Sequence, residues 1–335
     1  MQQNKSLFFG IIAAAVIIVI GMGAAIYFFA KPLNLPAAQQ QTSIEVAAPA
    51  ALEPWVTQAA AEFNRQNRST QVTVSAVDGL LPENRFPPTD PQAAPPAAWI
   101  APASFLAELA RDQGQSFDAE NRSVAGTLLA WGAYTDKEAA LTEKYGPLGW
   151  DSLHAKAAAP GDFLTLVIAG PTNSAEGLAA LISAAANPGK DNLTGADARQ
   201  AMAWLTETLA DNVRILPKPA ETFATAPGRS IGDVGLLPMV LWQKNGLHQM
   251  DDFNLTPATP PVRLDYPFLI WQGRGATEAG QQTAASFRDF LLTPAQQTKL
   301  AEYHFDPAAP DTIGAVQADG DAALTLLRWA ERELR

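Results

Sequence analysis

Residues 163–186 read FLTLVIAGPTNSAEGLAALISAAA, and this stretch decides the fold. The first seven residues are almost all apolar, which is typical of a strand buried on both faces. The next four, Gly-Pro-Thr-Asn, are residue types that form turns. The remainder is rich in Ala and Leu and favours a helix from residue 174 to about 186. A buried strand, a turn and a helix in this order indicate one unit of an α/β sheet.

The rest of the chain repeats this alternation. Residues 80–96 hold six prolines and predict a surface loop. Strands alternating with helices indicate an α/β fold with largely parallel sheets, whose ligands bind beyond the carboxyl ends of the strands. Strands are predicted at 43–47, 70–76, 98–101, 127–134, 234–240 and 266–271, and helices at 52–67, 104–112, 152–157, 197–209, 278–292, 294–303 and 321–334.

Composition removes several classes of function. The 335 residues allow about two domains. The net charge of -11, from 23 basic and 34 acidic residues, argues against nucleic acid and against an anionic membrane surface as partners of the folded part. There is no Cys, which excludes disulfides, thiolate metal sites, cysteine catalysis and an acylated lipoprotein anchor. The three His residues are far apart, so we expect no metal site and no cofactor.

The first segment predicts a membrane anchor. Residues 7–30 carry no charged or strongly polar side chain over 24 residues. At about 1.5 Å per residue they reach roughly 36 Å, enough to span a bilayer core of about 30 Å. Lys5 and Lys31 flank the run. The distribution of positive charge around it favours a cytoplasmic N-terminus with the main domain outside. A cleaved signal peptide is the alternative, although its apolar core is usually shorter, about 7–15 residues. We therefore divide the chain into an anchor (1–31), a linker (32–42) and a body (43–335).

Six segments of the body carry a resemblance to a known family. They read IEVAAPAALEPWVTQAAAEFNRQN, AAWIAPASFLAEL, GPLGWDSL, GPTNSAEGLAALISAAA, DYPFLIW and AASFRDFLLTPAQQTKLAEYHFDPA. In this order they resemble the bacterial extracellular solute-binding proteins with the type II periplasmic-binding fold, and in particular the variety often fused to a von Willebrand factor A domain. The late helix of that family reads F-x-x-F-L-x-x-x-x-Q before a Phe-x-Pro, a pattern matched by Phe287, Phe290, Leu291, Gln296, Phe305 and Pro307.

The resemblance implies a two-lobed architecture. Lobe one would comprise about residues 43–132 and 266–335, and lobe two about 133–265. The chain would leave lobe one near 131–134 and return near 265–271. A solute would lie in the cleft, and the lobes would close on it by hinge motion. The implied partner is an ABC-type permease.

The turn after the strand at 163–169 is the first candidate binding site. Free N–H groups and the helix dipole at such a place favour an anion or a polar oxygen. Thr172, Asn173 and Ser174 add hydroxyl and amide groups. Glu176 in the first helical turn would repel a bound anion. The alternative is that Asn173 or Ser174 simply caps the helix.

Other candidates are less distinctive. In the first loop, residues 47–51, the backbone amides of Ala50 and Ala51 are available, but the Ser that oxyanion-binding relatives often carry there is missing. Ser104 in the third loop is either a ligand contact or a helix cap. Asp233 either lines the cleft or is a solvated turn carboxylate. Four tryptophans either stack on a sugar or pack in the core: Trp99, Trp131, Trp242 and Trp271.

Two functions remain after these exclusions. One is a membrane-anchored receptor that delivers a small polar solute to an ABC permease. The other is a scaffold that has kept the fold without a ligand and acts as an interaction module in a cell-envelope complex, with a von Willebrand factor A protein as a candidate partner. A hydrolase lacks its parts, because Thr172 and Glu176 occupy the glycine positions of the Gly-x-Ser-x-Gly elbow around Ser174. We expect no catalytic residue.

Overall fold

The structure is a computed structural model that describes residues 41–82, 84–90, 92–187, 189–308 and 314–334. The predicted anchor, residues 7–30, lies outside this part of the chain. Within the described ranges, no helix has both the length and the apolar character needed to cross a bilayer.

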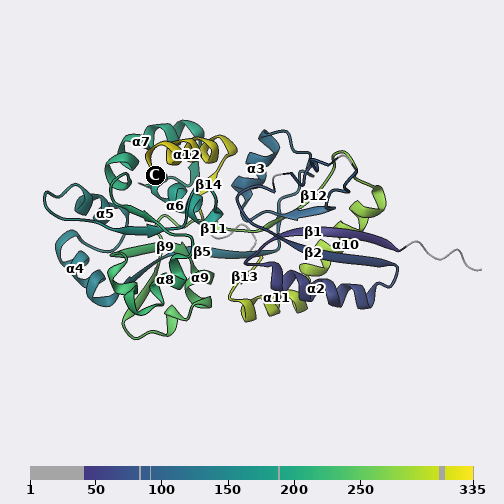
Figure 1. Cartoon of the computed structure of the whole chain (residues 1–335), viewed down its shortest axis with the longest axis horizontal. Coiled ribbons are helices and arrows are strands. Elements are labelled where there is room, and N and C mark those ends of the chain that lie inside the picture. The colour runs from purple at the N-terminus through teal and green to yellow at the C-terminus, as the bar shows by residue number, and fades with distance from the viewer. Residues whose placement is uncertain (1–40, 83, 91, 188, 309–313, 335) are drawn as a thin grey trace, which may run out of the picture. The chain divides into compact units, whose positions relative to one another are not determined.

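One five-stranded sheet organises what we call lobe one (Figure 1). Strand β1 runs parallel to β2 over eight residue pairs and parallel to the central strand β3, whereas β12 is antiparallel to β3 and β4. The order is β2 (Thr70–Val77), β1 (Thr42–Pro49), β3 (Ala98–Ile100), β12 (Pro267–Ile270) and β4 (Arg122–Ser123). The flanking helices are α2 (Glu53–Gln66), α3 (Ser104–Asp112) and α10 (Glu278–Leu291).

A second sheet organises lobe two. Its strand β6 is parallel to both β8 and β9, while β5 is antiparallel to β9 and β10. The order is β10 (Phe253–Pro257), β5 (Ala125–Tyr134), β9 (Val234–Pro238), β6 (Leu166–Ile168) and β8 (Val213–Ile215). Its helices are α4 (Thr135–Tyr145), α5 (Trp150–Ala157), α6 (Ala175–Ala185), α7 (Gly195–Leu209), α8 (Pro219–Phe223) and α9 (Met239–Lys244).

The prediction of a two-lobed α/β fold is confirmed, with local differences. Both sheets are mixed rather than largely parallel. The strand predicted at 234–240 ends at Pro238, where α9 begins. The helix predicted at 294–303 is divided into α11 (Pro294–Lys299) and a 3₁₀ turn (Leu300–Tyr303). Helix α4 and strands β8 and β10 were not predicted from the sequence.

The chain passes between the sheets earlier than the family resemblance implies. Residues 129–132 of β5, expected at the end of lobe one, already pair with β9 in the second sheet. The passage lies at residues 123–125, between β4 and β5. The return strand β11 (Arg263–Leu264) and the short β13 (Asp306–Pro307) both pair with β5 near the passage. The apolar run 125–134 is continuous, so nothing in it marks where one sheet ends and the other begins.

The last helix, α12 (Gly320–Glu333), contacts α6 and α7 of lobe two as well as α3 of lobe one. The expected lobe one includes this helix within residues 266–335. Gly320 lies so close to α3 that a Cβ there would be 3.1 Å from the backbone nitrogen of Leu109. At the other end, the Trp329 indole donates to the Thr206 hydroxyl of α7 at 3.1 Å. The helix is therefore packed against both lobes.

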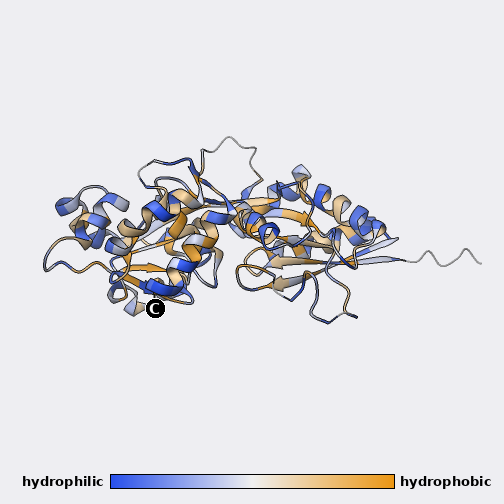
Figure 2. Cartoon of the chain, turned by 90° about the horizontal axis from the view of Figure 1, so that it is seen from above, coloured by the Kyte–Doolittle hydropathy of each residue, from blue (hydrophilic) through white to orange (hydrophobic). Residues whose placement is uncertain are grey.

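The core of each lobe follows its sheet. Figure 2 shows apolar residues along the strands and on the helix faces turned toward them. The four tryptophans considered for sugar stacking are all core residues, with exposed fractions between 0% and 3%: Trp99, Trp131, Trp242 and Trp271. Their positions agree with the packing interpretation rather than with ligand stacking.

Candidate ligand cleft

A cavity of about 670 Å³ lies where the carboxyl ends of β1 and β6 meet. This is the position at which α/β sheets bind ligands, and the volume is in the usual range for small-molecule sites, about 300–1,000 Å³. Lobe one contributes Pro49, Ala50, Ala51, Val77, Asp78, Gly79 and Pro102; lobe two contributes Ala169, Gly170, Asn173, Ser174, Ala175, Glu176, Ile215, Leu216 and Pro217; Tyr266 comes from the connection between them.

Four of the six predicted binding residues line this cavity: Ala50, Ala51, Asn173 and Ser174. Thr172 instead lines a neighbouring cavity of about 610 Å³ that reaches Leu324 and Leu327 of α12. The two cavities share residues 77–79 and Asn173, so together they form one elongated groove.

Ser104 is held by a protein partner. It is the first residue of α3, whose N-cap position is taken by Ala103, so Ser104 does not cap the helix and α3 has no side-chain cap. The Ser104 backbone N–H donates to Asp265 at 2.7 Å, and its hydroxyl donates to the other oxygen of the same carboxylate. Ser123 also donates to Asp265, at 3.2 Å. These bonds fix the start of α3 to the return strand beneath the cleft.

The turn before α6 is built by local hydrogen bonds. Ser174 is the N-cap, and its hydroxyl accepts from the Gly177 N–H at 3.1 Å. The Ser174 N–H donates to the Gly170 carbonyl at 2.9 Å, which closes the turn. Ser174 thus performs the capping role of the alternative interpretation. The exposed side-chain amide of Asn173 has no hydrogen-bond partner among the described residues, which leaves it available to a ligand.

Burial raises the pKa values of two titratable groups that line the cavity. Burial raises the pKa of the Glu176 carboxyl, although its own N–H and the Ser174 hydroxyl donate to it and act in the opposite direction. Burial also raises the pKa of Tyr266 well above 10, and the nearby Glu176 and Asp265 carboxylates add to that shift. Tyr266 is therefore a neutral phenol, and its backbone has the positive φ of 44° that is rare outside Gly.

Sequence reasoning missed Tyr266, Asp78 and residues 215–217 as cavity residues. Asp78-Gly79 directly follows β2, and residues 216–217 directly follow β8. The rule that ligands bind beyond strand ends would have found the first pair, because the strand at 70–76 was predicted. The second set depends on β8, whose three residues Val-Arg-Ile are too short a stretch for the alternation of apolar and polar residues to identify a strand.

Asp233 lies away from the cleft, at the start of β9. It accepts from Lys156 at 2.7 Å and from the Thr165 N–H at 2.9 Å, and Lys137 lies 3.4 Å away. Burial alone would raise the pKa of Asp233, but these hydrogen bonds and positive charges outweigh it and lower the pKa. The group is therefore a structural ion-pair member, which differs from both roles expected from the sequence, a cleft residue or a solvated turn carboxylate.

Lys156→Met is expected to destabilise the protein by about 1–2 kcal/mol, because it leaves the mostly buried Asp233 carboxylate without its nearest charge partner. Urea unfolding measures the loss. Lys218→Met, which removes the exposed partner of Glu221, is the matched control and should change little. Equal effects of the two variants would contradict a structural role for the Asp233 ion pair.

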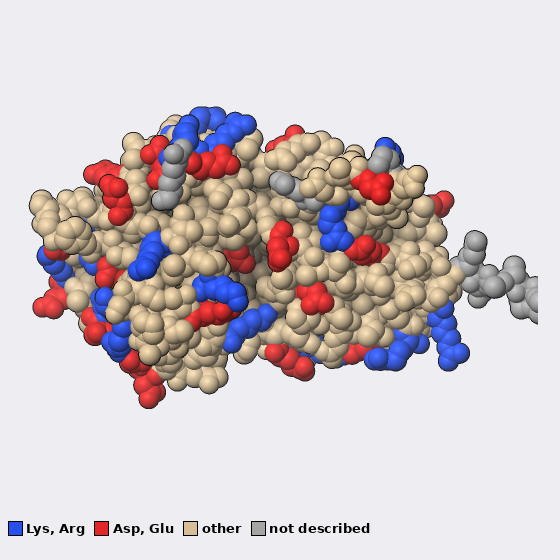
Figure 3. All heavy atoms as spheres, viewed as in Figure 1, with Lys and Arg blue, Asp and Glu red and all other residues tan. Residues whose placement is uncertain are grey.

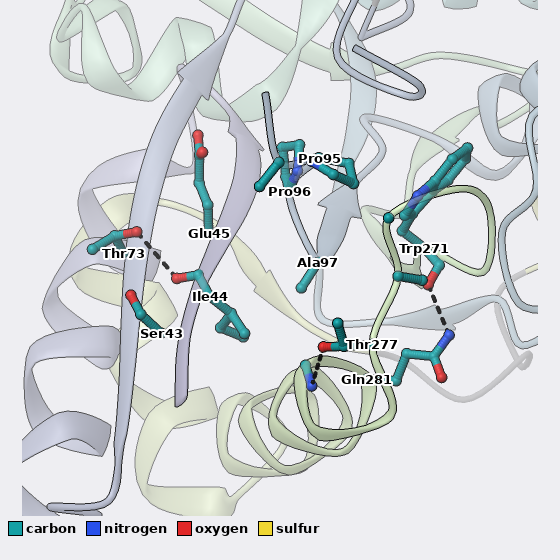
Figure 4. A pocket seen from close by; sticks show the side chains of 14 residues that line it. Ser43, Ile44, Glu45, Thr73, Pro95, Pro96, Ala97, Trp271, Thr277 and Gln281 are labelled. Atoms are coloured by element: carbon teal, nitrogen blue, oxygen red, sulfur yellow. Dashed lines mark hydrogen bonds between the residues drawn. The ribbon is translucent and has the colours of Figure 1, made fainter. Parts of the chain in front are cut away.

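A further cavity of about 380 Å³ lies at the opposite end of β1 (Figure 4). Its polar groups are largely engaged within the protein. Thr73 donates to the Ile44 carbonyl at 3.1 Å, and Gln281 donates to the Trp271 carbonyl at 3.1 Å. It lies at the amino end of β1, where α/β sheets do not usually bind ligands, so it is a weaker candidate than the cleft.

The surface agrees with a small-solute site rather than a nucleic-acid site. On the face shown in Figure 3, acidic and basic side chains are interspersed, and the seam between the two lobes is hollowed. No continuous basic patch is visible on that face.

Comparisons with known proteins agree with this geometry. The sequence model of a family described as bacterial extracellular solute-binding protein matches residues 44–306. No curated protein matches the chain. The periplasmic binding protein AfuA from Actinobacillus pleuropneumoniae, solved with fructose-6-phosphate, is 15% identical with a TM-score of 0.60, and the match covers 88% of this chain and 99% of AfuA.

Two other solved structures are similar at comparable levels. Iron-bound HitA from Pseudomonas aeruginosa is 14% identical with a TM-score of 0.58, over 86% of this chain and 98% of HitA. A periplasmic thiamin binding protein is 12% identical with a TM-score of 0.57, over 88% of this chain and 96% of its own. At these identities the likeness concerns the fold alone. The family match spans both lobes and the strands between them, and the chain belongs to the bacterial extracellular solute-binding protein family.

Proposed function

We propose that the protein is an extracytoplasmic receptor that binds a small polar solute in the cleft cavity and presents it to an ABC-type permease. The observation that carries the proposal is the cavity itself, which brings the loops after β1 and β6 together at the strand ends. Residues 7–30 would tether the receptor to the membrane with its body outside.

Free backbone donors support ligand binding in this cavity. The N–H groups of Ala50 and Ala51 donate to no acceptor among the described residues, and the same is true of Ala175 at the first position of α6. Unpaired N–H groups at a helix start and in a tight loop are the donors that bind polar solutes in such folds. The Asn173 amide adds a donor and an acceptor beside them.

The apolar wall contributed by lobe one favours a second candidate function. Its side chains are mainly Pro49, Ala50, Ala51 and Pro102, with Asp78 as the polar exception. A cavity with so few side-chain polar groups is also what a binding-protein fold without a solute would show. In that case the protein would be a scaffold in a cell-envelope complex, with a von Willebrand factor A protein as its partner.

Ligand screening by thermal shift on the full-length protein, purified in detergent, separates the two functions. The panel contains sugars, amino acids, oxyanions, organic cations and divalent metals. A ligand present at 100 times its Kd adds about 2.7 kcal/mol of stability, which is a shift of several degrees for a protein of this size. A saturable shift supports the receptor, and a flat response from a folded sample supports the scaffold.

Ser174→Ala is expected to lower stability by about 1 kcal/mol through loss of the α6 cap and also to weaken solute binding. The matched control is Thr277→Ala, which removes the equivalent cap of α10, where the Thr277 hydroxyl accepts from the Gly280 N–H at 3.1 Å. Both variants should lose similar stability in thermal unfolding. Binding that falls equally in both, measured by calorimetry, would contradict a ligand site at α6.

A further inference from the structure

The charge of the cleft cavity has one sign. Asp78 and Glu176 carry its acidic groups, and the described residues that line it include no Lys, Arg or His. Arg85 and Arg328 line the neighbouring cavity, where Arg85 is paired with Glu45, and neither lines the cleft cavity. Lys244 donates to the Ala51 carbonyl of the first loop at 2.7 Å and lies over the Phe305 ring, and it is not among the lining residues either. An anionic solute would therefore meet no counter-charge in this cavity.

Glu176 is an unpaired carboxylate. Three other half-buried acids lie against a basic side chain: Glu62 with Lys299, Asp118 with Arg288, and Asp233 with Lys156. Among the described residues, Glu176 has no such cation, although it is half-buried at the start of α6. A desolvated charge is costly unless it is paired. Glu108 also lacks an ion pair in the described part of the chain, but it lies on α3 and outside the cavity.

Tyr266 adds an aromatic surface to the same cavity. The residue is 2% exposed and lines the cavity, as does Glu176, and its ring packs at a right angle to Phe305 with centroids 5.3 Å apart. A neutral aromatic ring and a carboxylate are the two groups that attract an ammonium ion in a poorly hydrated site. A bare metal ion fits less well, because no group of three or more metal-ligating side chains exists among the described residues.

We propose that the solute is an organic cation, with an ammonium or related group that Glu176 neutralises in the cleft. This inference rests on the proposed receptor function and names the chemical class of its solute. The volume of about 670 Å³ leaves room for an organic body beyond the charged group. The apolar lining from lobe one then packs against that body, which gives the Ala and Pro residues of the first and third loops a role.

The binding test uses probes that differ mainly in charge. Choline, putrescine and agmatine are compared with dimethylbutanol, the neutral isostere of choline, and with the anions sulfate, molybdate and succinate. Isothermal titration of the full-length protein should detect at least one of the three cations and none of the anions. Glu176→Gln should lower the affinity for the cation at least tenfold, since it removes the counter-charge. Glu108→Gln removes an unpaired carboxyl outside the cavity and should leave affinity unchanged.

A ligand-free measurement tests the unpaired carboxylate itself. The raised pKa of Glu176 stabilises the fold below its ordinary pKa of 4.5, and that stabilisation is lost as pH rises through the raised value. The melting temperature of Glu176→Gln should therefore match the wild type near pH 4.5 and exceed it increasingly toward pH 8. A variant that is less stable at pH 8 would show that Glu176 is satisfied within the protein, and would overturn the proposal.

The outcomes separate this proposal from the receptor function. A neutral or anionic probe that binds saturably, and that Asn173→Ala weakens, overturns the cation assignment and leaves the receptor intact. Cation binding that Glu176→Gln does not weaken also overturns the assignment. If no probe of any class binds the folded protein, both the receptor function and its cationic solute are overturned.

Discussion

Trp242→Ala should lower the free energy of unfolding by about 3–5 kcal/mol, the largest single loss that we expect in the second lobe. The indole is 0% exposed and packs edge-to-face with Phe223, with ring centroids 5.5 Å apart. Its Nε1 donates to the Ala130 carbonyl at 3.0 Å, which ties α9 to β5. Alanine would leave a cavity between these elements and an unpaired carbonyl beside it.

Urea unfolding followed by circular dichroism measures this loss. Trp242→Phe is the matched variant, because it keeps most of the aromatic volume and removes the hydrogen bond. It should cost clearly less than alanine. A loss below about 1.5 kcal/mol for Trp242→Ala would show that the surrounding residues collapse into the space of the missing ring. It would contradict tight packing of Trp242 between α9 and β5.

Gly177→Ala should disrupt both folding and binding. A Cβ at Gly177 would lie 2.3 Å from the Ala169 carbonyl oxygen and 2.7 Å from the backbone of residues 170 and 171. These are backbone atoms, so relief requires the whole turn that carries Asn173 and Ser174 to move away from α6. We expect a loss of about 3 kcal/mol or more, comparable with the overpacking of a dense core, together with loss of solute binding.

The control is Gly280→Ala, at the equivalent third position of α10. There the nearest atom to an added Cβ is the Thr277 hydroxyl at 2.9 Å, and the next is a side-chain methyl of Ile44 at 3.8 Å. The strain at Gly280 therefore falls on side chains, and thermal unfolding should show a smaller loss than at Gly177. Equal losses would contradict the claim that close backbone packing makes Gly177 special.

Local signals made part of this fold predictable. The unit at 163–186 has a mostly apolar run, turn residues and a Ser that caps the helix, and the structure forms β6, the turn and α6 there. The buried strand predicted at 163–169 is shorter than expected, because β6 covers only Leu166–Ile168 and Phe163 is 85% exposed. Helix α4 has only Leu141 buried, so its sequence shows no apolar periodicity and gave no prediction. The passage between the two sheets was expected near 131–134 but lies at 123–125, because the whole apolar strand β5 belongs to the second sheet and its sequence carries no mark of that boundary.

The candidate site was likewise only partly predictable from the sequence. Asn173 and Ser174 follow a strand end, which is a local property, and both line the cavity. The lack of a cation near Glu176 depends on which side chains the fold brings near, and sequence order does not contain that information. Ser104 shows the reverse case, because its hydroxyl was available in the sequence and is bound to Asp265, far along the chain.

Helix α12 raises the free energy needed to separate the two lobes. It contacts α3 on one side and α6 and α7 on the other, so an outward swing must break one of these two sets of contacts. We expect these contacts to weight the ligand-free ensemble toward the arrangement in which α12 contacts both lobes. Since the apparent Kd equals the intrinsic Kd divided by the binding-competent fraction, such weighting brings the apparent affinity close to its intrinsic limit. We therefore expect solute release to require that α12 separate from one lobe.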